Sequence, residues 1–138
     1  MVAIQQDARI NDVLYYIHRD LSAPLTGAVL ARVAAYSEQH FHRVFQRVTG
    51  ESLHRYIRRI RLEQAANLLM FEPDSPVRDI ALKSGYSSLA SFTRIFGEQF
   101  GISPGRWRHQ ETPQMLPYNT DPEIAAGAKR IAGYPLPV

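Results

Sequence analysis

The sequence contains no cysteine. Disulfide bonds and thiolate metal sites are therefore excluded, and we expect a cytoplasmic protein. No apolar run approaches the ~18 residues of a membrane-spanning helix. The N-terminal residues also lack a basic segment followed by a long apolar run, so no secretory signal is visible. We expect no membrane partner.

Motifs for catalysis are also missing. The sequence has no HExxH motif, no glycine-rich phosphate-binding loop and no serine-nucleophile elbow. His40 and His42 are two residues apart and would face different sides of a helix, which makes them a poor metal-binding pair. We therefore expect no enzymatic activity, no cofactor and no metal site.

Lysine is scarce as well, because fourteen of the sixteen cationic side chains are arginine. Arginine suits bidentate recognition of phosphates and of guanine edges. Arginine-rich surfaces are also common in proteins from GC-rich genomes, and the net charge is only +3. Charge alone therefore does not decide whether the partner is a nucleic acid.

The stretch from Ser52 to Phe71 predicts one long helix, since it has no glycine or proline inside it. Ser52 is a good N-terminal cap, and Pro73 ends the run. A helix of about 20 residues is roughly 30 Å long. Its apolar residues form an early and a late stripe about half a turn apart: Leu53, Tyr56, Ile57 and Ile60, then Leu62, Ala65, Ala66 and Leu69. Such a helix connects two packed modules, and we expect its Arg58 and Arg59 to form a solvated face.

Helical periodicity and capping residues predict shorter helices on both sides of this connector. The expected elements before it are a helix over residues 7–21 capped by Asp7, a short helix opened by Thr26, and a helix between Ser37 and Gly50. Those after it are a short helix around Ile80 to Leu82, a helix capped by Ser87 or Ser88 and ended by Gly101, and a final helix from Ser103-Pro104. No strand pattern appears before residue 111, so the predicted class is all-α.

The two halves repeat each other at an offset of 50 to 51 residues. The matching pairs share residue type and order: Leu30-Ala31 with Ile80-Ala81, Tyr36-Ser37 with Tyr86-Ser87, Phe41 with Phe92, Arg43 with Arg94, Phe45 with Phe96, Gly50 with Gly101, Ser52 with Ser103, and Tyr56 with Trp107. Each copy is a short helix, a tight turn and a second helix. We predict two three-helix helix-turn-helix modules, a homeodomain-like pair, joined by the connector. The second helix of such a unit lies in the DNA major groove, and a rod of roughly 30 Å matches the ~34 Å of one DNA turn.

At this point the sequence resembles the DNA-binding domain of AraC/XylS-family transcription regulators, over about Ile10 to Arg108. The resemblance rests on LARVAAYSEQHFHRVFQRVTGESLHRYIRRIRLEQAANLL and on IALKSGYSSLASFTRIFGEQFGISPGRWR. It implies a seven-helix domain of two modules that binds double-stranded promoter DNA, regulates transcription as an activator or a repressor, and recruits or positions RNA polymerase.

In the first module, the helix after Ser37 is expected to bury Phe41, Val44, Phe45 and Val48. Its opposite stripe can hydrogen-bond to base edges and comprises Gln39, His42, Arg43 and Gln46. The resemblance places base contacts at Gln39, His42 and Arg43. The alternative is a plain solvated helix face.

In the second module the corresponding stripe is Ala90, Thr93, Arg94 and Gly97, and the resemblance places base contacts at Leu89, Ala90, Ser91 and Arg94. Only a few of these are strong polar readers, whereas Leu89 and Ala90 can at most pack on a thymine methyl group. We expect the first module to carry more of the specificity and the second to contribute largely through phosphates.

Phosphate contacts are expected at helix N-termini and at nearby polar side chains. The candidates are Ser37, Arg47, Arg55, Ser87, Ser88 and Thr93. For the serines, simple helix capping is the alternative, and it is compatible with phosphate binding.

The composition changes after residue 110, so we predict a DNA-binding domain over 1–110 and a proline-rich linker over 111–138, with one short helix at Pro122 to Lys129. Either the chain is a free-standing activator, or the linker leads to a C-terminal domain beyond Val138 that binds a small-molecule effector. A different class of function is a protein-interaction module that uses the helix-turn-helix scaffold without binding DNA.

Overall fold

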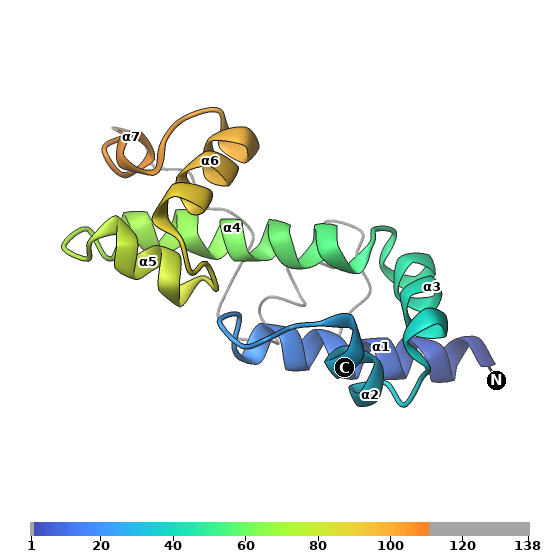
Figure 1. The fold of residues 1–138 in the computed structure, drawn as a ribbon. Coiled ribbons are helices and arrows are strands. Elements are labelled where there is room, and N and C mark those ends of the chain that lie inside the picture. The colour runs from blue at the N-terminus through green and yellow to red at the C-terminus, as the bar shows by residue number, and fades with distance from the viewer. Residues whose placement is uncertain (1, 111–138) are drawn as a thin grey trace. The chain divides into compact units, whose positions relative to one another are not determined.

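The computed structural model describes the backbone of residues 2–110 and the side chains of residues 8–110. These residues form seven helices and no strand (Figure 1), which confirms the all-α class. The helices are α1 (Val2–Arg19), α2 (Gly27–Val33), α3 (Glu38–Thr49), α4 (Leu53–Phe71), α5 (Val77–Lys83), α6 (Leu89–Phe100) and α7 (Pro104–Arg108). The described residues divide into two compact units, unit 1 up to Arg58 and unit 2 from Arg59.

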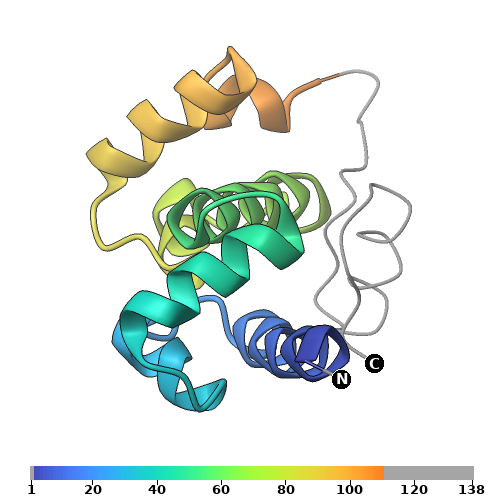
Figure 2. The ribbon, with the colours of Figure 1, turned by 90° about the vertical axis from the view of Figure 1, so that its right-hand side faces the viewer.

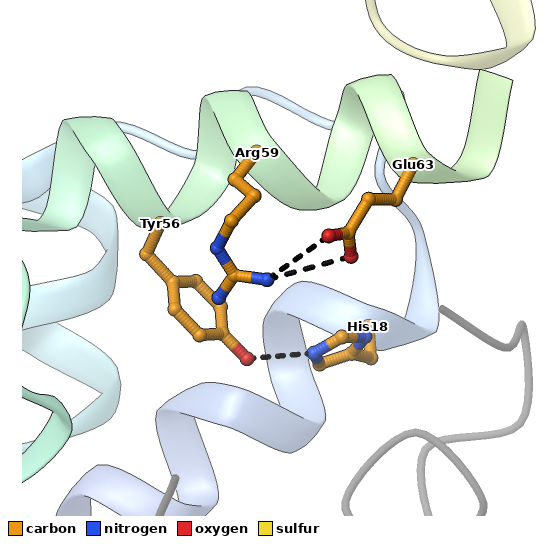
Figure 3. Close-up of polar contacts among 4 residues, drawn as sticks. All are labelled: His18, Tyr56, Arg59 and Glu63. Carbon is orange, nitrogen blue, oxygen red and sulfur yellow. Dashed lines mark hydrogen bonds and ion pairs between the residues drawn. The ribbon is translucent and has the colours of Figure 1, made fainter. Parts of the chain in front are cut away.

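Unit 1 is built from α1, α2 and α3, which pack against one another (Figure 2), together with the first turns of α4. Its core consists of fully buried aliphatic and aromatic side chains, among them Ile10, Leu14, Ile17, Leu30, Phe41, Phe45 and Leu53. The ring of Tyr56 meets Phe45 edge-on at a centroid distance of 5.5 Å. Its hydroxyl lies 2.8 Å from Nε2 of the buried His18 (Figure 3). The aromatic stripe of α3 and the early stripe of α4 therefore share one core.

The first helix differs from its predicted bounds, because α1 begins at Val2 and ends at Arg19. Asp7 lies inside the helix and does not cap it. The residues before it, such as Gln5 and Gln6, favour helix, so the helix extends past a potential cap. The end at Arg19 is set by Asp20, whose carboxylate accepts hydrogen bonds from the amide and the hydroxyl of Ser22 at 3.0 and 2.6 Å. The hydrogen bond from the Ser22 hydroxyl lowers the pKa of Asp20, and this local turn replaces another turn of helix.

Unit 2 is centred on an apolar cluster that the late stripe of α4 shares with α5, α6 and α7. Its buried members are Leu62, Ala65, Ala66, Leu69, Ile80, Ala81, Phe92, Phe96 and Trp107. Ile95 and Phe100 of α6 are only half-buried and pack against this cluster. The Trp107 indole Nε1 donates to the Ala66 carbonyl at 2.9 Å, and Nε of Arg108 donates to the Leu69 carbonyl at 3.2 Å. The short helix α7 is thereby fixed to α4.

The connector is confirmed as one helix, α4, which spans 19 residues (Figure 1) or about 28 Å at 1.5 Å per residue. Ser52 caps it, since its hydroxyl oxygen accepts from the Arg55 amide at 3.3 Å. Both predicted apolar stripes are buried. Arg58 is exposed as expected. The prediction for Arg59 is wrong, because its guanidinium pairs with Glu63 at 3.3 Å (Figure 3) and its side chain is only 20% exposed.

The sequence repeat has a structural counterpart, since α2–α3 and α5–α6 are both helix-turn-helix pairs with the same turn. Ala35 and Gly85 occupy equivalent positions and both have positive φ, 58° and 92°. The next amide closes each turn in the same way, from Tyr36 to the Ala31 carbonyl and from Tyr86 to the Ala81 carbonyl. The prediction of two helix-turn-helix modules is therefore confirmed.

Candidate nucleic-acid interface

In unit 1 the helix α3 is fixed at both ends and buries one face. The Ser37 hydroxyl oxygen accepts from the His40 amide at 3.3 Å, and Gly50 ends the helix in the left-handed conformation. Phe41, Val44 and Phe45 are completely buried, whereas Val48, which was expected in the core, is half-buried. The opposite face exposes Gln39, Arg43, Gln46 and Arg47. Four predicted DNA-contacting side chains are thus brought together on one helix surface.

His42, the remaining candidate on α3, is half-buried and held by its neighbours. Its Nε2 lies 3.9 Å from a Glu38 carboxylate oxygen, and its ring stacks on His54 at a centroid distance of 6.1 Å. A Cβ atom added at Gly27 would lie only 2.6 Å from His42 Nε2. Gly27 and His54 therefore position a candidate base-contacting side chain, and neither residue was predicted from the sequence. Only the tertiary packing of α2 and α4 against α3 brings them near His42.

In unit 2 the helix α6 is capped by Ser88, whose hydroxyl oxygen accepts from the Ser91 amide at 3.2 Å. This answers the open choice between Ser87 and Ser88. Both serines are exposed, as are the predicted contacts on the first turns of α6: Leu89, Ala90, Ser91, Thr93 and Arg94. Arg94 forms an ion pair with Glu98 one turn further on, at 3.0 Å. This pair is absent from the predictions above, although an acidic residue four positions after an arginine is its signal in the sequence.

A hollow of about 300 Å³ lies at the start of α6. It is lined by Arg78, Ala81, Leu82, Tyr86, Ser87 and Leu89. Leu82 is 52% exposed and Leu89 is 40% exposed. This end of unit 2 therefore presents more apolar surface than the matching end of unit 1, where Glu38 and Gln39 stand in place of Leu89 and Ala90.

All phosphate candidates except Thr93 lie at or next to a helix end. Ser37 and Ser88 cap α3 and α6, so their capping role is confirmed, and a capped helix N-terminus is compatible with phosphate binding. Arg47 lies in the last turn of α3, and Arg55 lies exposed in the first turn of α4. Within residues 8–110, no group of three or more histidine or acidic side chains could hold a metal ion. No helix of the described part is long and apolar enough to span a membrane.

The chain is similar to a known protein family, to known proteins and to solved structures. Residues 30–110 match the family model described as a helix-turn-helix domain. The chain is 37% identical over 101 residues to the regulatory protein SoxS of Escherichia coli, covering 73% of this chain and 94% of that protein. It is 33% identical over 124 residues to the Right origin-binding protein of Escherichia coli, covering 90% of this chain but only 42% of that longer protein. A solved structure of a probable AraC family transcriptional regulator from Rhodopseudomonas palustris superimposes with a TM-score of 0.65 at 29% identity, covering 76% of this chain and 98% of that chain.

Two helix-turn-helix units with exposed polar second helices, and a family match over more than half the chain, define a helix-turn-helix DNA-binding protein. Within that class, the chain belongs to the AraC/XylS family of sequence-specific transcription regulators, as its similarity to SoxS and to the Rhodopseudomonas regulator shows.

Proposed function

We propose that this protein regulates promoters by placing α3 and α6 in successive major grooves of double-stranded DNA. The observation that carries the proposal is the polar, exposed face of α3 above a fully buried aromatic ridge. A helix fixed in this way can present its side chains to base edges without distorting its own core. The length of α4, about 28 Å at 1.5 Å per residue, suits a pair of readers one DNA turn apart, ~34 Å.

In unit 1 we assign the base contacts to Gln39, His42, Arg43 and Gln46, and the phosphate contacts to Ser37, Arg47 and Arg55. Arginine pairs with guanine and glutamine with adenine through two hydrogen bonds each. The cluster of Gly27, Glu38 and His54 holds the imidazole of His42 before DNA arrives, which lowers the entropic cost of its contact.

In unit 2 we assign base contacts to Ala90, Ser91 and Arg94, and phosphate contacts to Ser87, Ser88 and Thr93. Ala90 and Leu89 offer apolar surface to a thymine methyl group, and Arg94 is the one arginine of α6. Unit 1 therefore carries more of the hydrogen-bonded sequence recognition.

The domain bounds, the protein partner and the cellular location are also part of the proposal. We infer that residues 1–110 act as the DNA-binding domain, that RNA polymerase is a further partner, and that the protein activates transcription in the cytoplasm. The match to the Right origin-binding protein covers 124 residues of this chain and so extends beyond Gln110, while it leaves more than half of that relative unmatched. We further propose that a linker after Gln110 leads to a C-terminal effector-binding domain. The predicted helix at Pro122 to Lys129 lies outside the described residues.

The test is selection of a binding site from a randomised duplex pool at two salt concentrations. We expect a site that spans two grooves, and Arg43→Ala should lose about 1–3 kcal/mol of discrimination at one base pair of it. Arg94→Ala should weaken binding with a smaller change in sequence preference. Arg19→Ala, an exposed arginine of α1, is the charge-matched control and should bind like wild type. If no sequence is enriched, the protein-interaction function takes precedence.

A further inference from the structure

The second helix of unit 2 carries its only basic side chain in an ion pair. Nη1 of Arg94 donates to Oε1 of Glu98 at 3.0 Å, and the two side chains are 65% and 52% exposed. Exposed pairs of this kind contribute little to stability. The main effect of the Arg94–Glu98 pair is therefore on the charge that α6 presents to a partner.

The repeat supplies an internal comparison. At the offset of 51 residues, Arg94 corresponds to Arg43, while Glu98 corresponds to Arg47. The residue one helical turn after the reading arginine is thus basic in α3 and acidic in α6. Arg94 and Glu98 are the only charged residues in α6, so the helix has no net charge.

We propose that Glu98 is a positioning residue for DNA recognition by unit 2, an inference that rests on the proposed function. The carboxylate holds one amino group of the Arg94 guanidinium, which leaves Nε and the other amino group to face a guanine edge. The same carboxylate repels the DNA backbone and keeps Arg94 from binding any nearby phosphate. Glu98 thereby lowers the affinity of the protein for DNA of any sequence more than it lowers the affinity for the specific binding site.

This inference refines the expectation that unit 2 contributes largely through phosphates. A neutral pair on α6 leaves phosphate binding by this helix to its N-terminus and to hydroxyl groups such as those of Ser87, Ser88 and Thr93. Removing the charge of Glu98 should convert Arg94 into an additional phosphate contact.

The experiment compares Glu98→Gln with wild type on the selected duplex and on a scrambled duplex, over a range of salt concentrations. One added phosphate contact steepens the dependence of log K on log salt by about 0.9. At 0.1 M salt this corresponds to roughly a five- to tenfold gain in affinity for the scrambled duplex. The gain on the selected duplex should be smaller, so that the specificity ratio falls. Asp74→Asn removes one negative charge from an exposed loop position of the same unit and is the matched control.

A second pair of variants separates positioning from simple charge repulsion. In an Arg94→Ala background, Glu98→Gln should change the specificity ratio little, because no guanidinium remains to be held. The proposal is overturned if Glu98→Gln behaves like Asp74→Asn, or if its effect on the ratio is as large without Arg94. Failure of the proposed function has a different signature, since wild type itself would then bind both duplexes equally.

Discussion

The ring of His42 occupies the space that a side chain at position 27 would fill. A Cβ atom there would lie 2.6 Å from His42 Nε2 and 2.9 Å from a Glu38 carboxylate oxygen. Both atoms are ends of side chains that can move, so the backbone need not shift. Position 27 therefore controls where His42 points without being needed for the fold.

We predict that Gly27→Ala leaves stability unchanged or raises it by about 0.5 kcal/mol, since alanine restricts the unfolded chain. Because the imidazole is displaced, the protein should bind the selected duplex more weakly by about 1 kcal/mol. Thermal unfolding and titration of the duplex measure the two effects separately. Loss of folding, or unchanged DNA binding, would contradict the positioning of His42 by Gly27.

The hydrogen bond between His18 and Tyr56 joins α1 to α4 inside unit 1 (Figure 3), and both side chains are at least 97% buried. Tyr56→Phe removes the hydroxyl and should lower the free energy of unfolding by about 1–2 kcal/mol. Urea denaturation measures this loss of unfolding free energy, and we expect the m-value to be unchanged. Tyr16→Phe, at a half-buried ring of α1, is the comparison and should cost less. Equal losses in the two variants would argue against a specific contribution from the buried pair.

At the scale of the elements, several helices begin at a residue whose side chain makes a single capping hydrogen bond. Ser88 and Ser87 are adjacent exposed serines, but only the Ser88 side chain accepts the hydrogen bond from the Ser91 amide that caps α6. Ser88→Ala should therefore lower the free energy of unfolding by about 1 kcal/mol, the usual contribution of an N-cap. Ser87→Ala should lie within experimental error of wild type. Denaturant titration of both variants decides the matter, and the reverse order would show that Ser87 is the cap.

The ends of most helices could be predicted, because the residues that set them are close to them in the sequence. The serine caps at Ser37 and Ser52 and the glycine after α3 act within one helical turn, so the sequence contains all the partners involved. The start of α1 was missed because Asp7 resembles a cap while the residues before it also favour helix. The turn at Ala35 carries no signal of its own, since alanine seldom adopts positive φ. Only its repeat partner, Gly85, marks that position as a left-handed turn.

Site residues, too, could be predicted only where their signal is local in the sequence. The exposed face of α3 was predictable because helical periodicity separates Arg43 and Gln46 from Phe41 and Phe45. The environment of His42 was not predictable, because Gly27 and His54 reach it from other helices. The exposure of Leu82 was not predictable either, since its neighbours Ile80 and Ala81 are buried and periodicity over a seven-residue helix is weakly defined.

At the scale of the whole molecule, the repeat explains how one chain can carry two DNA-reading units. The two copies share their turn geometry and their buried aromatic residues, while their exposed second helices differ in charge and polarity. The copies therefore agree in the residues that form their turns and cores and differ in the exposed side chains of their second helices. The proposed difference in their roles follows from that difference, with more hydrogen-bonded base reading by α3 and a surface without net charge on α6.

The most direct test of the two-groove proposal is affinity for the selected duplex after five base pairs are inserted between its two halves. Five base pairs are about half a turn of B-DNA, so the insertion moves the second half to the opposite face of the duplex. If both units read one face, affinity should fall at least tenfold, to the level of a duplex that keeps only the half read by unit 1. Unchanged affinity after the insertion would contradict the simultaneous reading of two successive grooves.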